Sequence, residues 1–307
     1  MDSKKLLSVV ISTFNPAIHR FAQTLQALAN QGLNKELWEL IVVDNNSTDD
    51  TAQLAKDFIA SHPQLNARYC FEGNKGLSYA RNRGVQEARS PIVNYVDDDA
   101  LLSPGYLQEM LQFFAAHPQA VGAGGKVIPK YEDGHEPAWM SKYLNGFIGK
   151  VDFGEQVQQF TAAMKYPVGC NMAYKKEVLL AAGGFNNALQ FRSDDKYIFQ
   201  QVAGISNQVY YVPKAWLHHY IDEHRLHPEN FKKLFLKTGN EEKKRVYHAE
   251  GTIGLVNKGI EFLFKFGASV ALLLLFMLKG QWAKGKYIFI SQYCTLKGFL
   301  AREVHVR

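Results

Sequence analysis

The chain contains few cysteines, and their positions exclude two kinds of cross-linked structure. Its 307 residues include three cysteines, Cys70, Cys170 and Cys294, which stand about a hundred residues apart. An odd number of distant cysteines without a C-x-x-C spacing argues against a disulfide framework and against a four-thiolate zinc site. It also favours a reducing compartment.

Two glycine-rich phosphate-binding motifs are absent as well. No G-x-G-x-x-G follows the first apolar run, which disfavours a dinucleotide-binding dehydrogenase, and no G-x-x-x-x-G-K-[ST] occurs, which disfavours a P-loop NTPase. The apolar run Leu6–Ile11 near the N-terminus is too short for a signal peptide and predicts a buried strand.

Excess positive charge is confined to the C-terminal quarter. With 47% hydrophobic and 21% charged residues, the chain has ordinary globular composition, which excludes a disordered or fibrous protein. Residues 1–225 hold 21 Lys and Arg against 23 Asp and Glu, a formal charge of −2. Residues 226–307 hold 14 against 6, a charge of +8. The sequence therefore predicts two parts, 1–225 and 226–307.

The first 130 residues predict an α/β fold. Apolar runs rich in β-branched residues alternate with segments of helical periodicity, which is typical of a mostly parallel sheet with helices on both faces. The predicted strands are residues 6–12, 37–43, 67–71, 92–96 and 121–128. Ligands bind such sheets at the carboxyl ends of strands, where the polar clusters of this sequence occur. Residues 129–166, which include Trp139, are predicted to form a loop-rich insertion.

The acidic triplet Asp97–Asp99 directly follows the predicted strand 92–96. Three adjacent carboxylates repel one another, and a bound cation would neutralise them. Oxygen ligands of this kind suit Mg²⁺ or Mn²⁺, which in turn hold a diphosphate. The alternative is a solvated turn, or the start of a helix ahead of Leu101.

Two further clusters are candidates for binding a phosphorylated nucleoside. Asp44 ends the second predicted strand, where it could accept a hydrogen bond from a base or ribose, while Ser47 and Asp50 could cap the next helix. Gly76 is predicted to open a helix whose amides face a phosphate, and Arg81, one turn later, could reach the same anion.

Two clusters in residues 167–219 offer groups for proton transfer and metal binding. Asp194 and Asp195 begin a predicted helix, either as charges facing the helix dipole or with one carboxylate acting as general base. His218 and His219 end an apolar strand and point to opposite faces. One could be structural while the other meets the metal.

The C-terminal part combines basic and apolar helical patterns. Residues 225–245 predict an amphipathic basic helix, and residues 266–278 contain no charge but form a helix only about 20 Å long, short of the roughly 30 Å hydrocarbon core. A buried core helix, an interfacial or re-entrant helix and a tilted span remain open. Flanking lysines, Trp282 and Tyr287 favour the membrane interface, and the basic excess favours anionic lipid.

Taken in order, these clusters resemble the family 2 glycosyltransferases, which are inverting nucleotide-sugar enzymes of the GT-A fold. The resemblance covers about residues 6–245. It rests on residues 12–15, 42–49, 74–84, 96–99, 169–172, 183–186, 194–195 and 213–219. Two positions depart from the family pattern. Phe14 stands where the family often has tyrosine, and Asp194 where it usually has glutamate.

The resemblance implies a role for each matching residue. Donor-binding residues would be Thr13, Asn15, Asp44, Arg81, Asp97 and Asp98. Asp99 and His219 would bind Mn²⁺ or Mg²⁺, and Asp195 would be the catalytic base. Asp194 and Asn171 would lie at the acceptor, together with the candidate Trp139.

The sequence as a whole predicts a glycosyltransferase at the cytoplasmic face of a membrane, peripheral or re-entrant. Its partners would be a nucleotide sugar, a glycan or lipid-linked acceptor, and an anionic membrane surface. The rival hypothesis is a non-catalytic nucleotide-sugar-binding or scaffold protein of the same fold. Nucleic-acid binding is disfavoured because the predicted domain is slightly acidic and the basic part shows no recognisable nucleic-acid-binding module.

Overall fold

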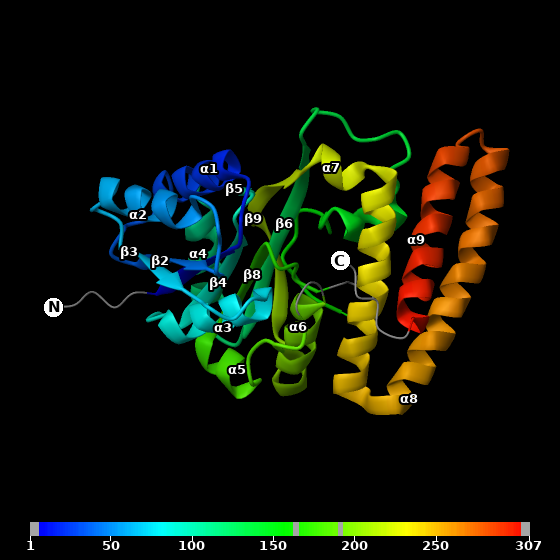
Figure 1. Ribbon diagram of the computed structural model, residues 1–307. Coiled ribbons are helices and arrows are strands. Elements are labelled where there is room, and N and C mark those ends of the chain that lie inside the picture. Colours follow the sequence, from blue (N-terminus) through cyan, green and yellow to red (C-terminus); the bar gives the residue numbers. More distant parts are fainter. Residues whose placement is uncertain (1–5, 162–165, 190–192, 302–307) are drawn as a thin grey trace. The chain divides into compact units, whose positions relative to one another are not determined.

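The computed structural model describes residues 6–161, 166–189 and 193–301, and within them the chain divides into two compact units (Figure 1). The first unit holds residues 6–129, 150–161, 166–189 and 194–220. The second holds 130–149, Ser193 and 221–301. Its largest segment begins at Ile221, close to the predicted division at Arg225, and the unit also takes part of the predicted insertion. The functions assigned to the two parts stay predictions. Residues 162–165, at the end of that insertion, lie outside the described residues.

The first four long strands form the parallel half of the sheet, as predicted. They are β1 (Leu7–Thr13), β2 (Trp38–Asp44), β3 (Ala67–Phe71) and β4 (Ile92–Asp97), arranged in the order β3-β2-β1-β4. β2 is buried along its whole length. A continuous apolar strand of this kind is typical of a parallel sheet covered on both faces.

The other half of the sheet contains antiparallel strands, so the sheet as a whole is mixed. β8 runs antiparallel to β4, and β6 runs antiparallel to β8. β5 and β7 both pair antiparallel with β9. The bounds are β5 (Ala100–Leu102), β6 (Gly122–Tyr131), β7 (Gln158–Gln159), β8 (Asn171–Lys175) and β9 (Val209–Ile221). The apolar pattern of residues 121–128 predicted a strand correctly but carries no signal for its direction.

Helices of the first unit flank this sheet (Figure 1). They are α1 (Ile18–Ala29), α2 (Thr51–Ser61), α3 (Leu77–Glu87), α4 (Tyr106–Ala116), α5 (Lys176–Ala181) and α6 (Asp194–Ile205). α3 packs very close to β1, because a Cβ on Gly84 would lie 2.3 Å from Cγ1 of Val10. This close approach fixes the position of Arg81 one turn earlier in the helix.

The second unit is helical. Its elements are the 3-10 helix η1 (Lys142–Phe147), α7 (Glu223–Leu226), α8 (Pro228–Leu278) and α9 (Trp282–Leu300). Gly251, at φ 63° and ψ −152°, breaks α8 into two parts, which we call the first arm (residues 228–250) and the second arm (residues 252–278). Figure 1 shows the two arms and α9 as three long helices lying side by side.

Within the described residues, α8 is the one helix that is long and apolar enough to cross a membrane by length and composition. The most apolar stretch of 18 residues in this helix has a mean hydropathy of 2.0, and only 11% of this stretch is buried within the protein. The helix after Gly251 is also longer than the uncharged run of 13 residues that the sequence suggested.

The junction of β6, β8 and β9 yields a test of the fold. A Cβ on Gly125 would lie 1.7 Å from the Ala215 carbonyl oxygen and 2.5 Å from Nδ2 of Asn171. We expect Gly125→Ala to lower the free energy of unfolding by about 1–3 kcal/mol, as overpacking does. Urea unfolding followed by tryptophan fluorescence measures this change. The control is Gly204→Ala in α6, where nothing lies within 4 Å and alanine favours the helix. Equal urea midpoints for the two variants would contradict the packing.

Candidate active site

Strand pairing brings the acidic triplet next to a histidine that follows it by 120 positions. Asp97 ends β4, and Asp99 directly precedes β5. β5 pairs with β9 in a register that sets Ala100 opposite His219, and the backbone N–H of Tyr220 donates to the carbonyl of Asp99 at 3.2 Å. The chain therefore places the imidazole of His219 at the end of β4.

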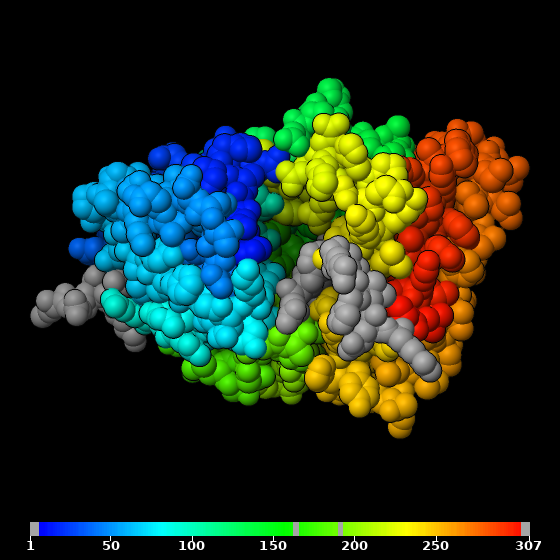
Figure 2. Space-filling view, viewed as in Figure 1, coloured from blue at the N-terminus to red at the C-terminus, as the bar shows by residue number. Residues whose placement is uncertain are grey.

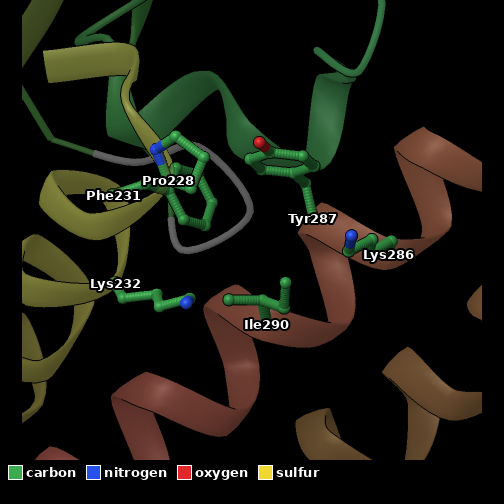
Figure 3. A pocket seen from close by; sticks show the side chains of 6 residues that line it. All are labelled: Pro228, Phe231, Lys232, Lys286, Tyr287 and Ile290. Atoms are coloured by element: carbon green, nitrogen blue, oxygen red, sulfur yellow. The ribbon is translucent and has the colours of Figure 1, made fainter. Parts of the chain in front are cut away.

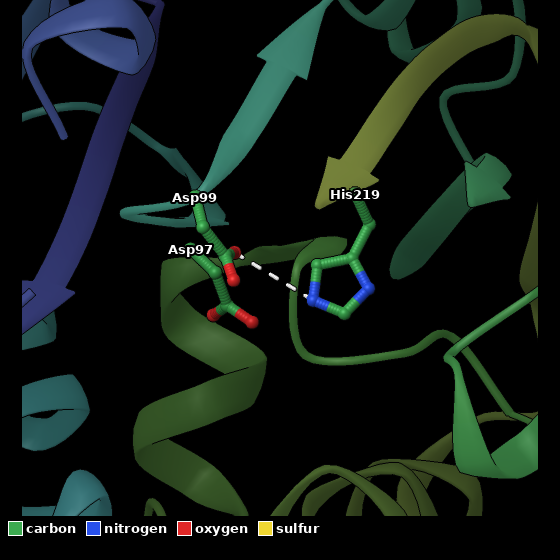
Figure 4. A group of neighbouring side chains, drawn as sticks. All are labelled: Asp97, Asp99 and His219. Carbon is green, nitrogen blue, oxygen red and sulfur yellow. Dashed lines mark ion pairs between the residues drawn. The ribbon is translucent and has the colours of Figure 1, made fainter. Parts of the chain in front are cut away.

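Asp97, Asp99 and His219 form a group that could hold a divalent cation (Figure 4). One ligand atom from each lies within 4.8 Å of the others, and His219 Nε2 is 3.6 Å from Asp99 Oδ1. Asp99 Oδ1 is buried and has no hydrogen-bond partner among the described residues. A buried carboxylate oxygen without a donor, beside a second carboxylate and an imidazole, fits a metal ligand set.

The same geometry distinguishes the two adjacent histidines. His219 lies with the carboxylates, while His218 pairs with Leu101 and points to the other face of the strand. Asp97, which the resemblance assigned to the ribose, is part of this group as well. Burial raises the pKa of Asp97, Arg81 opposes this shift, and the charge of Asp99 adds to it. A bound cation would relieve the repulsion between the two carboxylates.

Arg81 joins this group to the pair of acids at the start of α6. Its side chain is 3% exposed, with Nη2 lying 3.3 Å from Asp97 Oδ1 and Nη1 donating to Asp194 Oδ2. The neighbouring carboxylates raise the pKa of Arg81 against the effect of burial, so it remains charged. The sequence predicted a position near the nucleotide, and the structure adds that Arg81 bridges two carboxylates 97 residues apart in the chain.

Asp195 lies next to this bridge and is held by backbone amides. The N–H groups of Gly169 and Lys196 donate to its two oxygens at 3.2 and 2.7 Å. Burial and the charge of Asp194 raise the pKa of Asp195 to about 6, although Arg81 and the two amides oppose the shift. A carboxylate with this pKa is unprotonated at neutral pH and can still accept a proton, as a general base must.

The predicted donor residues cluster at the carboxyl ends of β1, β2 and β4. Asp44 accepts from the Ser47 N–H at 2.9 Å and from the Tyr69 hydroxyl at 2.8 Å. Asn15, at φ 45°, accepts from the Thr48 N–H at 2.8 Å. These bonds join the loops after β1 and β2. Ser47 accepts from the Asn15 N–H instead of capping α2.

Thr13 and Asp98 contact each other beside these loops. The hydroxyl of Thr13 donates to Asp98 Oδ2 at 2.5 Å, and burial together with Asp99 raises the pKa of Asp98 to about 8. Asp98 is therefore directed toward β1, and Asp97 and Asp99 toward His219.

Two of the residues predicted to contact the acceptor are buried and bonded within the protein, and their acceptor role stays a prediction. Asn171 is completely buried, and its amide group joins β8 to its neighbours through bonds with Tyr106, Gly125, Lys126 and Ala215. The carboxylate of Asp194 is 5% exposed and faces Arg81. Trp139, the third candidate, belongs to the second unit, where its ring stacks on Tyr287 with centroids 4.1 Å apart.

The second unit contains a small pocket of a different chemical character (Figure 3). Its volume is about 130 Å³, and it is lined by Pro228, Phe231, Lys232, Lys286, Tyr287 and Ile290. With two lysines and no carboxylate in its lining, it lacks the ligands of a cation site.

Comparison with known protein families shows which family the chain belongs to. Residues 8–181, more than half of the chain, match the model of glycosyl transferase family 2. The chain belongs to this family. The match covers β1 from its second residue, β2 to β4, the acidic triplet and Arg81, and it ends before Asp195 and His219.

Two curated relatives show the range of the family's sequences. The chain is 24% identical over 230 residues to the glucosyl-dolichyl phosphate glucuronosyltransferase of Haloferax volcanii, covering 71% of this chain and 70% of that one. It is 35% identical over 134 residues to the validoxylamine A glucosyltransferase of Streptomyces hygroscopicus subsp. jinggangensis, covering 43% and 30%.

Solved structures confirm the GT-A fold of the family 2 glycosyltransferases. The mannosyltransferase PcManGT of Pyrobaculum calidifontis, in complex with GDP-Man and Mn²⁺, superposes with a TM-score of 0.64 at 17% identity, covering 98% of this chain and 88% of that one. TarS 1-349 of S. aureus in complex with UDP gives 0.59 at 18% identity, covering 95% and 90%.

The metal group yields a direct test. We expect Asp99→Asn to weaken Mn²⁺ binding by more than about tenfold, because an amide replaces a charged ligand oxygen. Titration calorimetry with Mn²⁺ in the presence of excess nucleoside diphosphate measures the affinity. The control is Asp57→Asn, which alters an exposed carboxylate that accepts from Gln53. Unchanged Mn²⁺ affinity in Asp99→Asn would remove Asp99 from the ligand set.

Proposed function

We propose that this glycosyltransferase is metal-dependent and inverting, and that it transfers one hexose from a nucleoside-diphosphate donor to an acceptor hydroxyl in a single displacement. One observation carries the proposal. The buried Arg81 pairs with Asp97 of the candidate metal group and with Asp194, the neighbour of Asp195. These residues therefore form one cluster. Such a cluster sets a leaving-group site beside a proton acceptor.

On the donor side, residues at the strand ends would bind the nucleotide. Thr13, Asn15 and Asp44 would contact the nucleoside, and Asp97, Asp99 and His219 would hold Mn²⁺ or Mg²⁺. The bound cation would stabilise the negative charge that develops on the departing diphosphate. Arg81 adds a fixed positive charge beneath the same carboxylates, in a buried environment where it acts strongly.

On the acceptor side, Asp195 would take the proton of the attacking hydroxyl. The acceptor oxygen forms a bond to the anomeric carbon, the bond from that carbon to the phosphate oxygen breaks, and the nucleoside diphosphate leaves with the electron pair. A single attack from the opposite face inverts the configuration at this carbon, by the logic that gives inverting glycosidases one carboxylate base. The amides of Gly169 and Lys196 orient Asp195 for this step.

A non-catalytic nucleotide-sugar-binding or scaffold protein of the same fold is the alternative. Binding a donor needs no base, yet Asp195 is held by two amides and has its pKa raised to about 6. This placement favours the enzyme.

The acceptor and the location follow from the relatives and from the helical unit. The relatives include a glucosyl-dolichyl phosphate glucuronosyltransferase and a minor teichoic acid biosynthesis protein. We therefore propose a lipid-linked glycan or polysaccharide precursor as acceptor. The enzyme would work at the cytoplasmic face of a membrane, and the apolar second arm of α8 supports the membrane association.

Removing the base tests the assignment of Asp195. We expect Asp195→Asn to lower kcat by about a hundredfold or more, the usual size of a general-base contribution, while the Kd for nucleoside diphosphate stays within about twofold. Transfer is measured with labelled nucleotide sugars and Mn²⁺, and binding by calorimetry. The matched control is Asp152→Asn, an exposed partner of Lys126. Turnover of Asp195→Asn equal to that of the control would exclude Asp195 as the base.

The raised pKa of Asp195 predicts a pH profile. A base works only when it is unprotonated, so kcat/KM should be level above pH 7 and fall about tenfold per unit well below pH 6. Initial rates between pH 5 and 8 at saturating Mn²⁺ test this, after a preincubation control for irreversible loss at each pH. A profile that stays flat to pH 5 would contradict the assignment.

A further inference from the structure

The second arm of α8 exposes an apolar face along its whole length. Phe264 is 77% exposed and Leu278 is 88% exposed. Ile253, Val256, Ile260, Leu263, Val270, Leu274, Leu275 and Met277 are exposed as well. Thr252, Asn257 and Lys265 are the polar residues among the arm's exposed positions. In Figure 2 this arm, coloured orange, lies at the surface of the second unit. Contiguous exposed apolar surface of this extent marks an interaction site.

The opposite side of the second arm packs on α9. Phe262 contacts Phe299 with ring centroids 5.1 Å apart, and Phe266 contacts Phe289 at 5.4 Å. At the other end, a Cβ on Gly285 would lie 2.9 Å from Cα of Leu273. The arm therefore has one side on α9 and one side that is exposed in the part of the chain that the structure describes.

The far side of α9 packs on the first arm of α8. The rings of Phe231 and Tyr287 are 5.0 Å apart. A Cβ on Gly298 would lie 2.0 Å from the Leu236 carbonyl oxygen, and one on Gly239 would lie 2.1 Å from the carbonyl oxygen of Thr295. α9 is thus the middle helix of three, covered on both sides along most of its length.

The first arm is too polar to enter hydrocarbon. It carries Lys232, Lys233, Lys237, Glu241, Glu242, Lys243, Lys244 and Arg245. If the second arm crossed a membrane with α9, the first arm would have to cross as well, with all these charges, and a charged side chain at the bilayer centre costs about 2.5–3.5 kcal/mol or more. At about 40 Å, the second arm is long enough to span, so this packing, and not its length, excludes a span.

We propose that the second unit inserts the apolar face of the second arm into one leaflet of an anionic membrane, with its three helices parallel to the surface. The proposal rests on the membrane association included in the proposed function, and it selects the interfacial mode over a tilted span and a buried core helix. Trp282, 56% exposed at the turn into α9, has Lys286 Nζ 4.9 Å from its ring centroid. Aromatic and lysine side chains of this kind are typical of the headgroup level.

Charge selects anionic lipid over a second copy of the chain. Lys265, Lys279, Lys284 and Lys286 lie on the second arm, at its end or on the first turns of α9, whereas Glu261 is the one acid from residue 251 to residue 301. Lys258 is largely buried and also pairs with Glu242 of the first arm. Glu261 pairs with Lys258 and Lys265. Two copies packed face to face would bring these lysines together, while phosphate headgroups would neutralise them.

Vesicle flotation tests the insertion. The full chain should float with vesicles of equal phosphatidylglycerol and phosphatidylcholine, and at least tenfold less with phosphatidylcholine alone. Leu263→Glu combined with Phe264→Glu should lose flotation. Leu180→Glu, in α5 of the first unit, is the matched control because Leu180 is 56% exposed and Leu263 57%. Flotation of the double variant equal to that of the control, or a wild-type chain that stays off the vesicles, would overturn the proposal. Donor turnover with a water-soluble acceptor is measured separately, so a failed glycosyltransferase assignment is distinguishable.

Labelling of the two ends of the second arm distinguishes insertion from a span. Thr252→Cys and Lys279→Cys place single exposed thiols at these ends, and the native cysteines are all buried. With protein bound to sealed vesicles, a membrane-impermeant maleimide should label both variants completely from outside. Protection of Cys at one end until detergent is added would show a span and overturn the in-plane arrangement.

Discussion

A buried guanidinium holds the active site of the first unit together. Arg81 is almost fully buried, and a charge in that position is stable only when it is paired and hydrogen-bonded. Its partners are Asp97 on β4, which belongs to the candidate metal group, and Asp194 on α6, which adjoins the proposed base Asp195. Gly169 permits this arrangement, since a Cβ there would lie 2.3 Å from Nη2 of Arg81. The same glycine donates its N–H to Asp195.

Local signals predicted much of the fold and half of the site. Continuous apolar runs predicted β1 to β4, and three adjacent acids after β4 predicted a cation site. The three-residue strand β5 has no such signal, because Ala100–Leu102 is too short for a periodic pattern. Yet its pairing with β9 is what brings His219 to Asp99. The partners of Arg81 were equally hidden, since ion pairs across 113 residues leave no trace in spacing. Asn171 fits the family motif, but its buried amide joins strands.

The helical unit shows the same division between local pattern and tertiary contact. Composition predicted a basic and apolar C-terminal part and left its membrane mode open. It did not show that residues 130–149 join these helices, where Trp139 stacks on Tyr287 and Phe147 packs on Phe231. Nor did it show that α9 lies between the two arms of α8, which is the contact that argues for an in-plane helix. Close approach at Gly239 and Gly298 makes that layering possible.

The central claim is that one cluster contains the metal, the donor phosphates and the base. Anomalous X-ray scattering at the manganese edge, from crystals grown with Mn²⁺ and a nucleoside diphosphate, tests it most directly. We expect an anomalous peak within bonding distance of Asp99 and His219, with the diphosphate beside it. A structure with the nucleotide bound and no manganese at these residues would contradict it.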